Sequence, residues 1–371
     1  MNHLVISFYK YTKLQVPEDV RETLRSLCQS RSILGRILIA EEGVNGAICG
    51  TKEDIVKFQQ KIKEISFFSD LTYREQDVSH QVYHKLVVKV RKEIVYFGVP
   101  VSFAKEGTHL SPQNLKKWYD TNEDFVIVDA RNAHESEVGK FKDAIPLQIK
   151  TFREFPNQLK NLKQHKEKKI VLYCTGGIRC EKASAYLKEQ GFADVYQLDG
   201  GIVNYVNQFP NTYWQGGLFV FDDRLVSEIE EPITFCQFCE AACEKYTNCH
   251  NLTCDKLFIG CEKCLREMQS CCSSDCREAP RKRQVKKVPK LSIGKIENYF
   301  AQKNVALVKV EKGTIEINKN IFIEGKTTSF SQQVNSLRDF NGKEIDVAQE
   351  GELVTFPVLQ KVRKNDLVCV E

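Results

Sequence analysis

The first 98 residues alternate between strand-like and helix-like spacing of their apolar positions. The predicted strands are LVISFY, ILGRILIA, GAICG and KLVVKVRKEIV, and the predicted helices are EDVRETLRSLCQS and KEDIVKFQQKIKEI. Pro17 stands just before the first helix, at a position where proline is tolerated. In chain order these elements run strand, helix, strand, strand, helix, strand, with KLVVKVRKEIV closing the sheet. That order predicts a ferredoxin-like α+β domain over residues 1–98, in which two helices back one antiparallel sheet.

Short continuous apolar runs separated by helical stretches predict a different architecture for residues 99–215. The expected strands span residues 125–129, 170–174 and 195–198. Their spacing is typical of an α/β domain with a parallel sheet and helices on both faces. Reactive groups in such sheets lie beyond the carboxyl ends of the strands. Asp129, Arg131 and Cys174 are therefore expected at one edge, with Asp129 and Arg131 forming a structural ion pair.

Cys174 stands where the second of these apolar runs ends. Thr175–Gly177 then form a tight loop, and a helical pattern opens near Cys180. The backbone amides of such a loop and the positive end of the helix dipole both stabilise a thiolate, and the charge of Arg179 lies close by. We therefore interpret Cys174 as an acidic nucleophile rather than as a structural core cysteine.

This loop resembles the active-site loop of rhodanese domains, in which the cysteine carries a persulfide. Four residues separate Cys174 from Arg179, one fewer than in the related cysteine-dependent phosphatases, whose longer loop fits a phosphate. The shorter loop suits a single sulfur atom, so it favours sulfur or redox chemistry over dephosphorylation.

Composition adds the cellular context. The 371-residue chain has a net charge of +5 and 15 cysteines, and its hydrophobic fraction of 42% is ordinary for a globular protein. Its first residues lack the pattern of a signal peptide, and no apolar run approaches the ~20 residues of a membrane helix. We therefore expect a cytoplasmic protein that contacts no membrane, whose cysteines serve as reduced thiols, metal ligands or redox groups.

Ten of the cysteines lie within the hydrophilic segment 216–280, which is too short for a large core. Two C-x2-C pairs, together able to place four thiolates on one tetrahedral ion, are formed by Cys236, Cys239, Cys261 and Cys264. We predict a structural zinc ion on these four side chains, and redox-active disulfides are the alternative. A second zinc ion would take its ligands from Cys249, Cys254, Cys271, Cys272 and Cys276.

Basic residues cluster in two places that are candidates for contact with nucleic acid. The first is the edge of the KLVVKVRKEIV strand, where the basic residues are Lys85, Lys89, Arg91 and Lys92. The second is the linker at 281–290, which is expected to be flexible and whose basic residues include Arg281, Arg283, Lys286 and Lys287. A solvated surface is the alternative for the strand. Beyond the linker, short strands separated by turn residues predict a small β-barrel at 291–371.

Taken in order, several motifs resemble the bacterial tRNA uridine(34) 5-hydroxylase family, whose central domain is a rhodanese. The matching residues are Glu42–Gly46, Lys92–Val95, Asp129–Asn132 with Glu135 and Gly139–Phe141, Cys174–Glu181, Trp214 with Gly216, Phe219–Asp222 and the ten cysteines. The resemblance covers roughly residues 1–280. It implies an oxidoreductase that uses molecular oxygen to place a hydroxyl group on carbon 5 of the wobble uridine. It also implies the anticodon region of tRNA as partner and Cys174 as the essential residue.

The candidate catalytic residues are Cys174, Arg179 and Cys180, and the electron donor is an unidentified reductant. A persulfide or thiolate reductant and transient addition of sulfur to the pyrimidine ring are both compatible with the motif. Cys180 is a candidate for resolving an oxidised Cys174, with a half-buried place in the first helical turn as the alternative. Two other functions stay open, a plain sulfurtransferase and a non-catalytic tRNA-binding protein.

Residues 293–371 depart from that family. They contain Ile293–Ile296, Phe330, Val334 and Asp366–Val368, and with these residues they resemble the β-barrel second domain of translation GTPases. Barrels of that kind work around tRNA. We therefore expect the basic linker and the barrel to add affinity for tRNA rather than chemistry.

Overall fold

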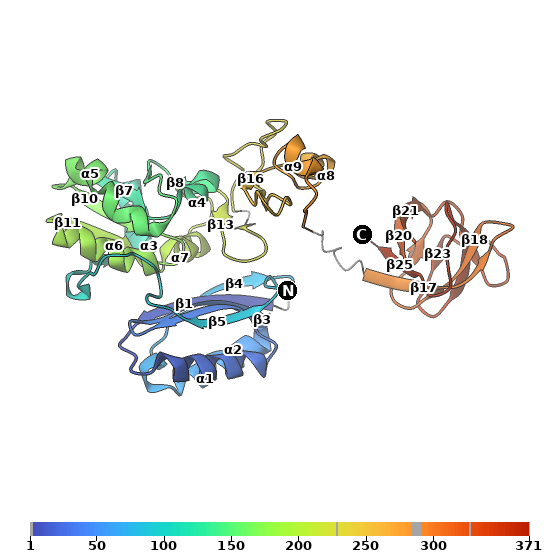
Figure 1. Ribbon diagram of the computed structural model, residues 1–371, viewed down its shortest axis with the longest axis horizontal. Coiled ribbons are helices and arrows are strands. Elements are labelled where there is room, and N and C mark those ends of the chain that lie inside the picture. The colour runs from blue at the N-terminus through green and yellow to red at the C-terminus, as the bar shows by residue number, and fades with distance from the viewer. Residues whose placement is uncertain (1–2, 228, 284–290, 326–327, 371) are drawn as a thin grey trace. The chain divides into compact units, whose positions relative to one another are not determined.

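The computed structural model describes residues 3–227, 229–283, 291–325 and 328–370. The chain divides into two compact units, one that ends at Arg283 and one that begins at Gln284, and each is described by itself. The first unit contains an N-terminal sheet with two helices, a parallel α/β sheet and a cysteine-rich segment (Figure 1).

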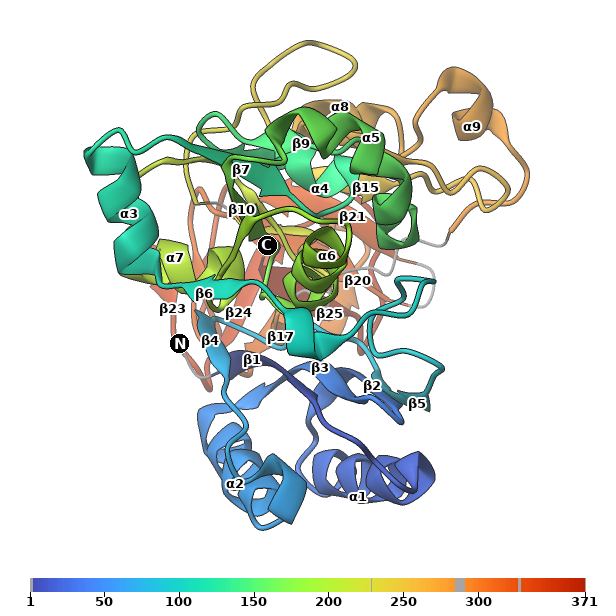
Figure 2. The same ribbon diagram turned by 90° about the vertical axis from the view of Figure 1, so that its left-hand side faces the viewer.

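The N-terminal part is a sheet backed by two helices, which confirms the predicted ferredoxin-like α+β arrangement. In spatial order its strands are β4 (Arg74–Val78), β1 (His3–Tyr11), β3 (Gly43–Thr51), β2 (Leu34–Ala40) and β5 (Leu86–Val90). Helices α1 (Pro17–Gln29) and α2 (Lys52–Lys63) cover one face of this sheet, as the turned view in Figure 2 also shows. Buried side chains such as Phe8, Ile37 and Ile48 form the core between the helices and the sheet. The second part of the unit packs against the opposite face of the sheet.

The strand that closes the ferredoxin-like sheet is not the one expected from the sequence. The apolar pattern assigns that position to KLVVKVRKEIV, but β4 occupies it and pairs antiparallel with β1. Strand β5, which comes from KLVVKVRKEIV, is instead a fifth strand that pairs parallel with β2. The sequence of β4 is REQDV, which is polar because the strand lies at a sheet edge with mostly exposed or half-buried positions. It therefore lacks the apolar pattern by which a strand is recognised.

A five-stranded parallel sheet forms the second part and confirms the predicted α/β architecture. In spatial order its strands are β6 (Thr108–Leu110), β11 (Asp194–Leu198), β10 (Lys169–Tyr173), β7 (Phe125–Asp129) and β9 (Ile145–Pro146). The helices are α3 (Pro112–Asp120), α4 (Ala133–Val138), α5 (Leu159–Leu162), α6 (Ile178–Glu189) and α7 (Gly201–Gln208). Alternate residues of β10 enter two cores, Ile170 and Leu172 on the side of α6, and Val171 and Tyr173 on the side of α7. Because both faces of β10 are covered, its sequence is apolar throughout.

Contacts between α6 and the N-terminal sheet join these two parts. The side chain of Lys182 is 3% exposed, and its ammonium group donates to Glu42 at 2.9 Å and to Glu93 at 2.7 Å. Tyr9 of β1 donates a hydrogen bond to Glu181 at 2.8 Å. One buried cation thus joins two carboxylates of the N-terminal part to α6, which fixes the sheet over that helix.

Short elements complete the first unit. They are β8 (Gly139–Phe141), β12 (Trp214–Gly216), β13 (Leu218–Phe219), β14 (Val226–Ser227), β15 (Tyr246–Asn248), β16 (Leu257–Ile259), α8 (Glu262–Glu267) and α9 (Ser274–Glu278). The last four belong to the cysteine-rich segment, where Phe258 and Leu265 pack with three buried cysteines in a small cluster. A core of this size contributes little stabilisation through apolar burial.

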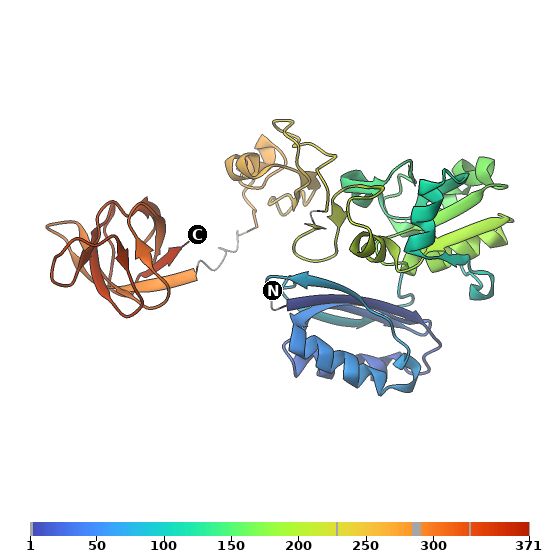
Figure 3. The same cartoon turned by 180° about the vertical axis from the view of Figure 1, so that it is seen from behind.

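The second unit is a curled seven-stranded antiparallel sheet, seen from behind in Figure 3, and confirms the β-rich architecture predicted there. In spatial order its strands are β21 (Ser329–Gln333), β20 (Asn320–Glu324), β25 (Leu367–Val370), β17 (Leu291–Phe300), β18 (Val305–Val310), β24 (Leu353–Pro357) and β22 (Arg338–Asp339). A further pair consists of β19 (Ile315–Glu316) and β23 (Val347–Ala348). Ile296, Val308 and Val354 are among the buried residues of its own core.

In the described part of the chain, every helix is too short or too polar to cross a bilayer.

Replacing Lys182 by methionine should lower the free energy of unfolding of the first unit by about 2 kcal/mol. The substitution leaves two carboxylates facing each other without their shared cation, a cost reduced here because Glu42 and Glu93 are 24% and 21% exposed. Urea denaturation followed by the fluorescence of Trp118 and Trp214, which both lie in this unit, measures the change.

The matched control is Lys57→Met, which removes an exposed pair with Glu53 on the surface of α2 and should leave the unfolding midpoint nearly unchanged. Equal effects of the two substitutions would contradict the role assigned to Lys182.

Candidate active site

The thiol of Cys174 lies at the carboxyl end of β10, where the chain turns into α6. The side chain is 0% exposed, and the amide of Gly177 donates a hydrogen bond to its Sγ at 3.1 Å. Gly177 has a φ of +100°, and a Cβ at this position would lie 2.9 Å from the hydroxyl oxygen of Tyr9. Both the backbone angle and the close approach favour glycine. The predicted tight loop is confirmed, with α6 beginning at Ile178 rather than near Cys180.

The surroundings of Cys174 favour a thiolate. Burial raises the pKa of this thiol. A hydrogen bond with Cys180, the charge of Arg179 and backbone amides in the loop outweigh burial and lower the pKa to about 5. The pKa of Cys180 is raised well above its usual value, by burial first and then by the neighbouring thiolate. At neutral pH the two side chains are therefore a thiolate and a thiol that donates to it.

Arg179 is held in place by a second buried group, Glu135. The two guanidinium nitrogens donate to the two carboxylate oxygens at 2.7 Å each. Burial raises the pKa of Glu135, but the charge and hydrogen bonds of Arg179 more than reverse this effect, so the pKa is lowered and the carboxylate is charged. Asp129 and Arg131 form a similar bidentate pair with both side chains 0% exposed, which confirms the predicted structural ion pair. Glu135, to which the sequence analysis assigned no role, thus orients the cation beside the thiolate.

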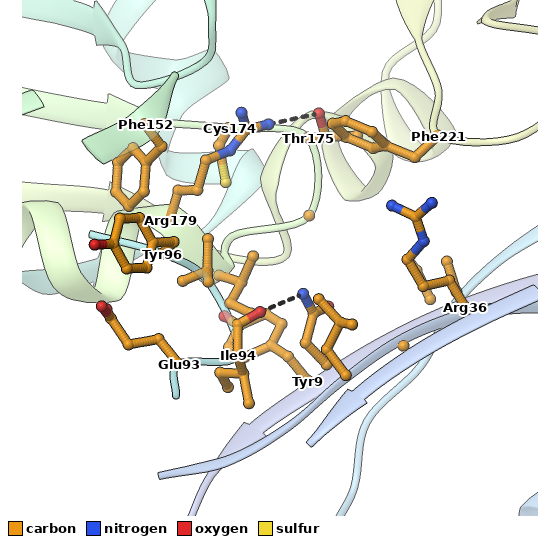
Figure 4. A pocket seen from close by; sticks show the side chains of 18 of the residues that line it. Tyr9, Arg36, Glu93, Ile94, Tyr96, Phe152, Cys174, Thr175, Arg179 and Phe221 are labelled. Carbon is orange, nitrogen blue, oxygen red and sulfur yellow. Dashed lines mark hydrogen bonds between the residues drawn. The ribbon is translucent and has the colours of Figure 1, made fainter. Parts of the chain in front are cut away.

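A cavity of about 830 Å³ lies between the N-terminal sheet and the Cys174 loop. In Figure 4, Cys174, Thr175 and Arg179 stand on one side of it, while Tyr9 and Arg36 project from the strands of the N-terminal sheet on the other. The segment that links the two parts supplies a further wall. The cavity therefore exists only because the two parts are packed together.

The lining of this cavity is cationic and aromatic. Its basic residues are Arg36, Arg74, Arg91, Lys92, Arg153 and Arg179. Glu135 compensates Arg179, and Lys182 compensates the lining carboxylate of Glu93, so the other cations leave the cavity positive. Tyr96 and Phe221 also line it, and each is 56% exposed. Positive charge beside exposed aromatic rings suits a nucleotide, whose phosphate and base need these two kinds of group.

The basic strand predicted to contact nucleic acid reaches the cavity only in part. Arg91 and Lys92 line it, whereas Lys85 and Lys89 are exposed but are not among the lining residues. Other cations of the lining were missed because each is isolated in the sequence and sits on a different element, so no local cluster marks them. These are Arg36 of β2, Arg74 of β4 and Arg153 of the segment before α5.

The structure describes only some of the basic residues of the predicted linker. Arg281 and Arg283 are exposed, in a segment that is hydrogen-bonded to the cysteine-rich part. Arg283 also forms an ion pair with Asp255. Lys286 and Lys287 lie outside the described residues, as does most of the stretch expected to be flexible.

The four predicted zinc ligands come together in space. The Sγ atoms of Cys236, Cys239, Cys261 and Cys264 all lie within 4.8 Å of one another. One C-x2-C pair precedes β15, and the other stands at the start of α8. Four thiolates in this arrangement can hold a tetrahedral metal ion.

Three protein-family models match successive parts of the chain. The model described as "UPF0176 acylphosphatase like domain" matches residues 3–94. "Rhodanese-like domain" matches residues 111–208, and "Rhodanase C-terminal" matches residues 215–277. These matches agree with the three parts seen in the first unit.

Curated relatives extend over all three parts together. The protein named "tRNA uridine(34) hydroxylase" from Chlamydia felis (strain Fe/C-56) is 37% identical over 291 residues, which cover 76% of this chain and 89% of that protein. The chain belongs to the tRNA uridine(34) hydroxylase family. Its member from Chlamydia trachomatis serovar D is 36% identical over 289 residues, which cover 76% of this chain and 88% of that one. The family resemblance predicted from the motifs is thus confirmed.

Solved structures resemble individual parts of the chain. The Alr3790 protein from Anabaena sp. is 20% identical, with a TM-score of 0.26, over 30% of this chain and 94% of that one. A rhodanese-like domain protein from Staphylococcus aureus is 24% identical, with a TM-score of 0.23, over 26% of this chain and 90% of that one.

Replacing Arg179 by glutamine should raise the pKa of Cys174 from about 5 toward the usual range, because the substitution removes the nearby positive charge. It should also lower the free energy of unfolding by about 3 kcal/mol, because fully buried Glu135 loses its partner. The ultraviolet absorbance of the thiolate, titrated with pH against a Cys174→Ser variant, reports the pKa, and urea denaturation reports the stability.

The double variant Glu135→Gln/Arg179→Gln separates the two effects. It should regain most of the lost stability, since no unpaired charge is left buried, while the pKa of Cys174 stays raised. A pKa that remains near 5 in both variants would show that Arg179 does not stabilise the thiolate.

Proposed function

We propose that this protein hydroxylates carbon 5 of the wobble uridine, position 34, in tRNA, and that the reaction takes place in the cavity above Cys174. The observation that carries the proposal is a thiolate beneath a positive, aromatic cavity, in a chain whose relatives are named tRNA uridine(34) hydroxylases. The partner is the anticodon region of tRNA, and with tRNA as substrate the protein acts in the cytoplasm.

The cavity suits a base that has left its stack. Turning the wobble base out of the anticodon loop costs a few kcal/mol. Stacking on an aromatic ring returns roughly 1–3 kcal/mol per base, and Tyr96 and Phe221 offer exposed rings in the cavity. Arg36, Arg74 and Arg153 are then available to the phosphates on either side of the base. Stacking and charge together offset the cost of unstacking.

The proposed reaction replaces the hydrogen on carbon 5 by a hydroxyl group, with molecular oxygen as oxidant. One oxygen atom enters the base, and the other leaves as water, which requires two electrons and two protons beyond those of the carbon–hydrogen bond. We assign the two electrons to Cys174 and Cys180, whose thiolate and thiol release two electrons and one proton when they join in a disulfide, and the second proton comes from solvent. The two thiols are close enough for each to shift the pKa of the other, which supports this assignment.

The proposed disulfide has to be reduced before the next cycle. Cys174 and Cys180 are both 0% exposed, so an external thiol would reach the disulfide through the cavity, after the modified tRNA has left. Arg179 contributes to the cycle by lowering the pKa of Cys174, which makes this sulfur the better leaving group when the disulfide is cleaved.

A sulfurtransferase that carries a persulfide on Cys174 is the second candidate function. The amide of Gly177, 3.1 Å from Sγ, favours it because such donors also stabilise an anionic persulfide. A cavity of about 830 Å³ with exposed aromatic rings is larger than a small sulfur donor requires, and this observation favours the hydroxylase. A thiosulfate–cyanide assay on the purified protein separates the two functions.

We also propose a structural zinc ion on Cys236, Cys239, Cys261 and Cys264. The Sγ atoms of Cys239 and Cys261 are 3.7 Å apart. Four sulfurs bound tetrahedrally at about 2.3 Å are separated by about 3.8 Å, whereas a disulfide needs about 2.05 Å. The spacing therefore supports a shared metal ion rather than a disulfide.

In the absence of added reductant, the fully reduced enzyme should form at most one 5-hydroxyuridine per chain, with an equal amount of Cys174–Cys180 disulfide. Nucleoside mass spectrometry of the tRNA and peptide mapping of the enzyme measure the two products. The Cys174→Ser variant should form none. The Cys180→Ser variant should form little until an external thiol is supplied, because Cys174 then needs another sulfur to complete a disulfide.

The matched control is Cys28→Ser. Cys28 is a fully buried cysteine of α1, and burial raises its pKa to about 12. This variant should behave like the wild type. Product formed without oxygen would rule out molecular oxygen as the oxidant, and many turnovers without a reductant would rule out Cys174 and Cys180 as the source of electrons. Normal product in Cys174→Ser would rule out the catalytic assignment itself.

Truncation after Arg283 should weaken tRNA binding and flatten its dependence on salt, because three lysines of the predicted linker, Lys286, Lys287 and Lys290, are removed together with the second unit. Turnover at saturating tRNA should largely survive, since the first unit keeps Cys174 and the cavity. Affinities of the full and truncated chains at several salt concentrations measure the effect. Equal affinities and equal slopes would show that the linker and the second unit serve another partner.

A further inference from the structure

A second group of four cysteines meets in the cysteine-rich segment, although none of its members has the C-x2-C spacing that would predict a metal site. Its members are Cys249, Cys254, Cys272 and Cys276, whose Sγ atoms all lie within 4.8 Å of one another. Cys254 and Cys272 are 3.7 Å apart, and Cys272 and Cys276 are 3.8 Å apart. Cys271, which the sequence analysis counted among the candidates, is not a member of the group.

These separations match a tetrahedral site for a single ion. Four thiolates on one zinc ion are separated by about 3.8 Å, given zinc–sulfur bonds of about 2.3 Å. A disulfide would bring two sulfurs to about 2.05 Å. An iron–sulfur cluster divides four cysteines among two or four iron atoms, and sulfurs on different iron atoms would lie farther apart than the 4.8 Å within which all four lie here.

Hydrogen bonds from neighbouring groups orient these sulfurs. The amide of Cys272 donates to the Sγ of Cys249 at 3.4 Å, and the side-chain amide of Asn251 donates to the Sγ of Cys276 at 3.4 Å. Cys276 is further fixed because Ser273 caps α9 through the amide of Cys276. Donors of this kind stabilise negatively charged sulfur and hold ligands in the direction a metal requires.

We propose that Cys249, Cys254, Cys272 and Cys276 form a second tetrathiolate zinc site, interleaved with the first. In chain order the cysteine pairs are 236 with 239, 249 with 254, 261 with 264, and 272 with 276. The first and third pairs belong to one site, and the second and fourth belong to the other. Each ion thus closes a chain loop that contains one ligand pair of its partner site.

Interleaving couples the two sites. Binding of one ion brings together the ends of a loop and so removes part of the entropy cost that the other ion would meet. The protein should therefore load two ions cooperatively, and each site should bind its ion more weakly when the ligands of the other site are removed. The metal sites do not depend on the proposed hydroxylase activity.

The second site also holds the basic segment that leads out of the first unit. The amide of Leu252 donates to the carbonyl of Arg281 at 3.0 Å, and the amide of Arg283 donates to the carbonyl of His250 at 2.6 Å. Asn251 and Lys282 form a β-bridge between these two bonds. Because Cys249 and Cys254 flank this paired loop, loss of their metal ion releases Arg281–Arg283.

The test is the number of zinc ions per chain, measured by native mass spectrometry on the full-length protein purified without chelator. The wild type should carry two. The variant Cys254→Ser/Cys272→Ser should carry at most one, and the matched control Cys243→Ser, which alters a cysteine of the same segment that belongs to neither group, should carry two. One zinc ion in the wild type, or two in the double variant, would overturn the proposal.

Cobalt titration of the metal-stripped wild type keeps the test independent of how the variant folds. Two equivalents should bind with the absorption of tetrahedral cobalt thiolates, and doubly loaded chains should outnumber singly loaded ones when one equivalent has been added. Saturation at one equivalent would overturn the second site. A native disulfide between any two of its four cysteines, found by alkylation and mass spectrometry under denaturing conditions, would do the same.

Discussion

A negative charge buried at the end of β10 is the constraint on which the first unit depends. The thiolate of Cys174 is 0% exposed, so its charge is maintained only because a thiol, backbone amides and Arg179 surround it. Arg179 is itself buried, and burial of its charge would cost free energy without Glu135, which accepts two 2.7 Å hydrogen bonds from it. Arg179 thus balances the charge of the Cys174 thiolate, and Glu135 of α4 balances the charge of Arg179. These contacts set the positions of the loop and of two helices.

The N-terminal sheet turns this buried charge into a binding site. Tyr9 approaches Gly177 so closely that only glycine fits, and Lys182 ties α6 to Glu42 and Glu93. These contacts place a cationic, aromatic wall opposite the loop, so the cavity belongs to both parts. A rhodanese-like domain by itself would present the same sulfur without a place for a base.

The cysteine-rich segment follows a different physical rule from the rest of the first unit. Its apolar cluster is small, so thiolates gathered around shared ions are a more effective source of stability than burial. Both groups of four cysteines have sulfur separations near those of a tetrahedral site. Metal ions bound at the two proposed sites would join the loops that carry these cysteines.

The sequence by itself determined the features that depend on neighbouring residues. The Cys174 loop could be predicted because the strand end, the glycines and the start of the helix follow one another within a few positions. The apolar patterns of the α+β part and of the parallel α/β part, and the paired C-x2-C spacings, are equally local. The family motifs, read in order, were enough to identify the chain's relatives.

Tertiary structure alone decided the features that depend on convergence. Strand β4 is polar because it lies at an edge, so only its pairing with β1 identifies it. Arg36, Arg74 and Arg153 come from three separate elements and meet only at the cavity. The division of eight cysteines into two interleaved groups likewise depends on how the loops cross. Periodicity and spacing act over a few residues, whereas charges, cavities and shared ligand sets depend on which distant surfaces pack against each other.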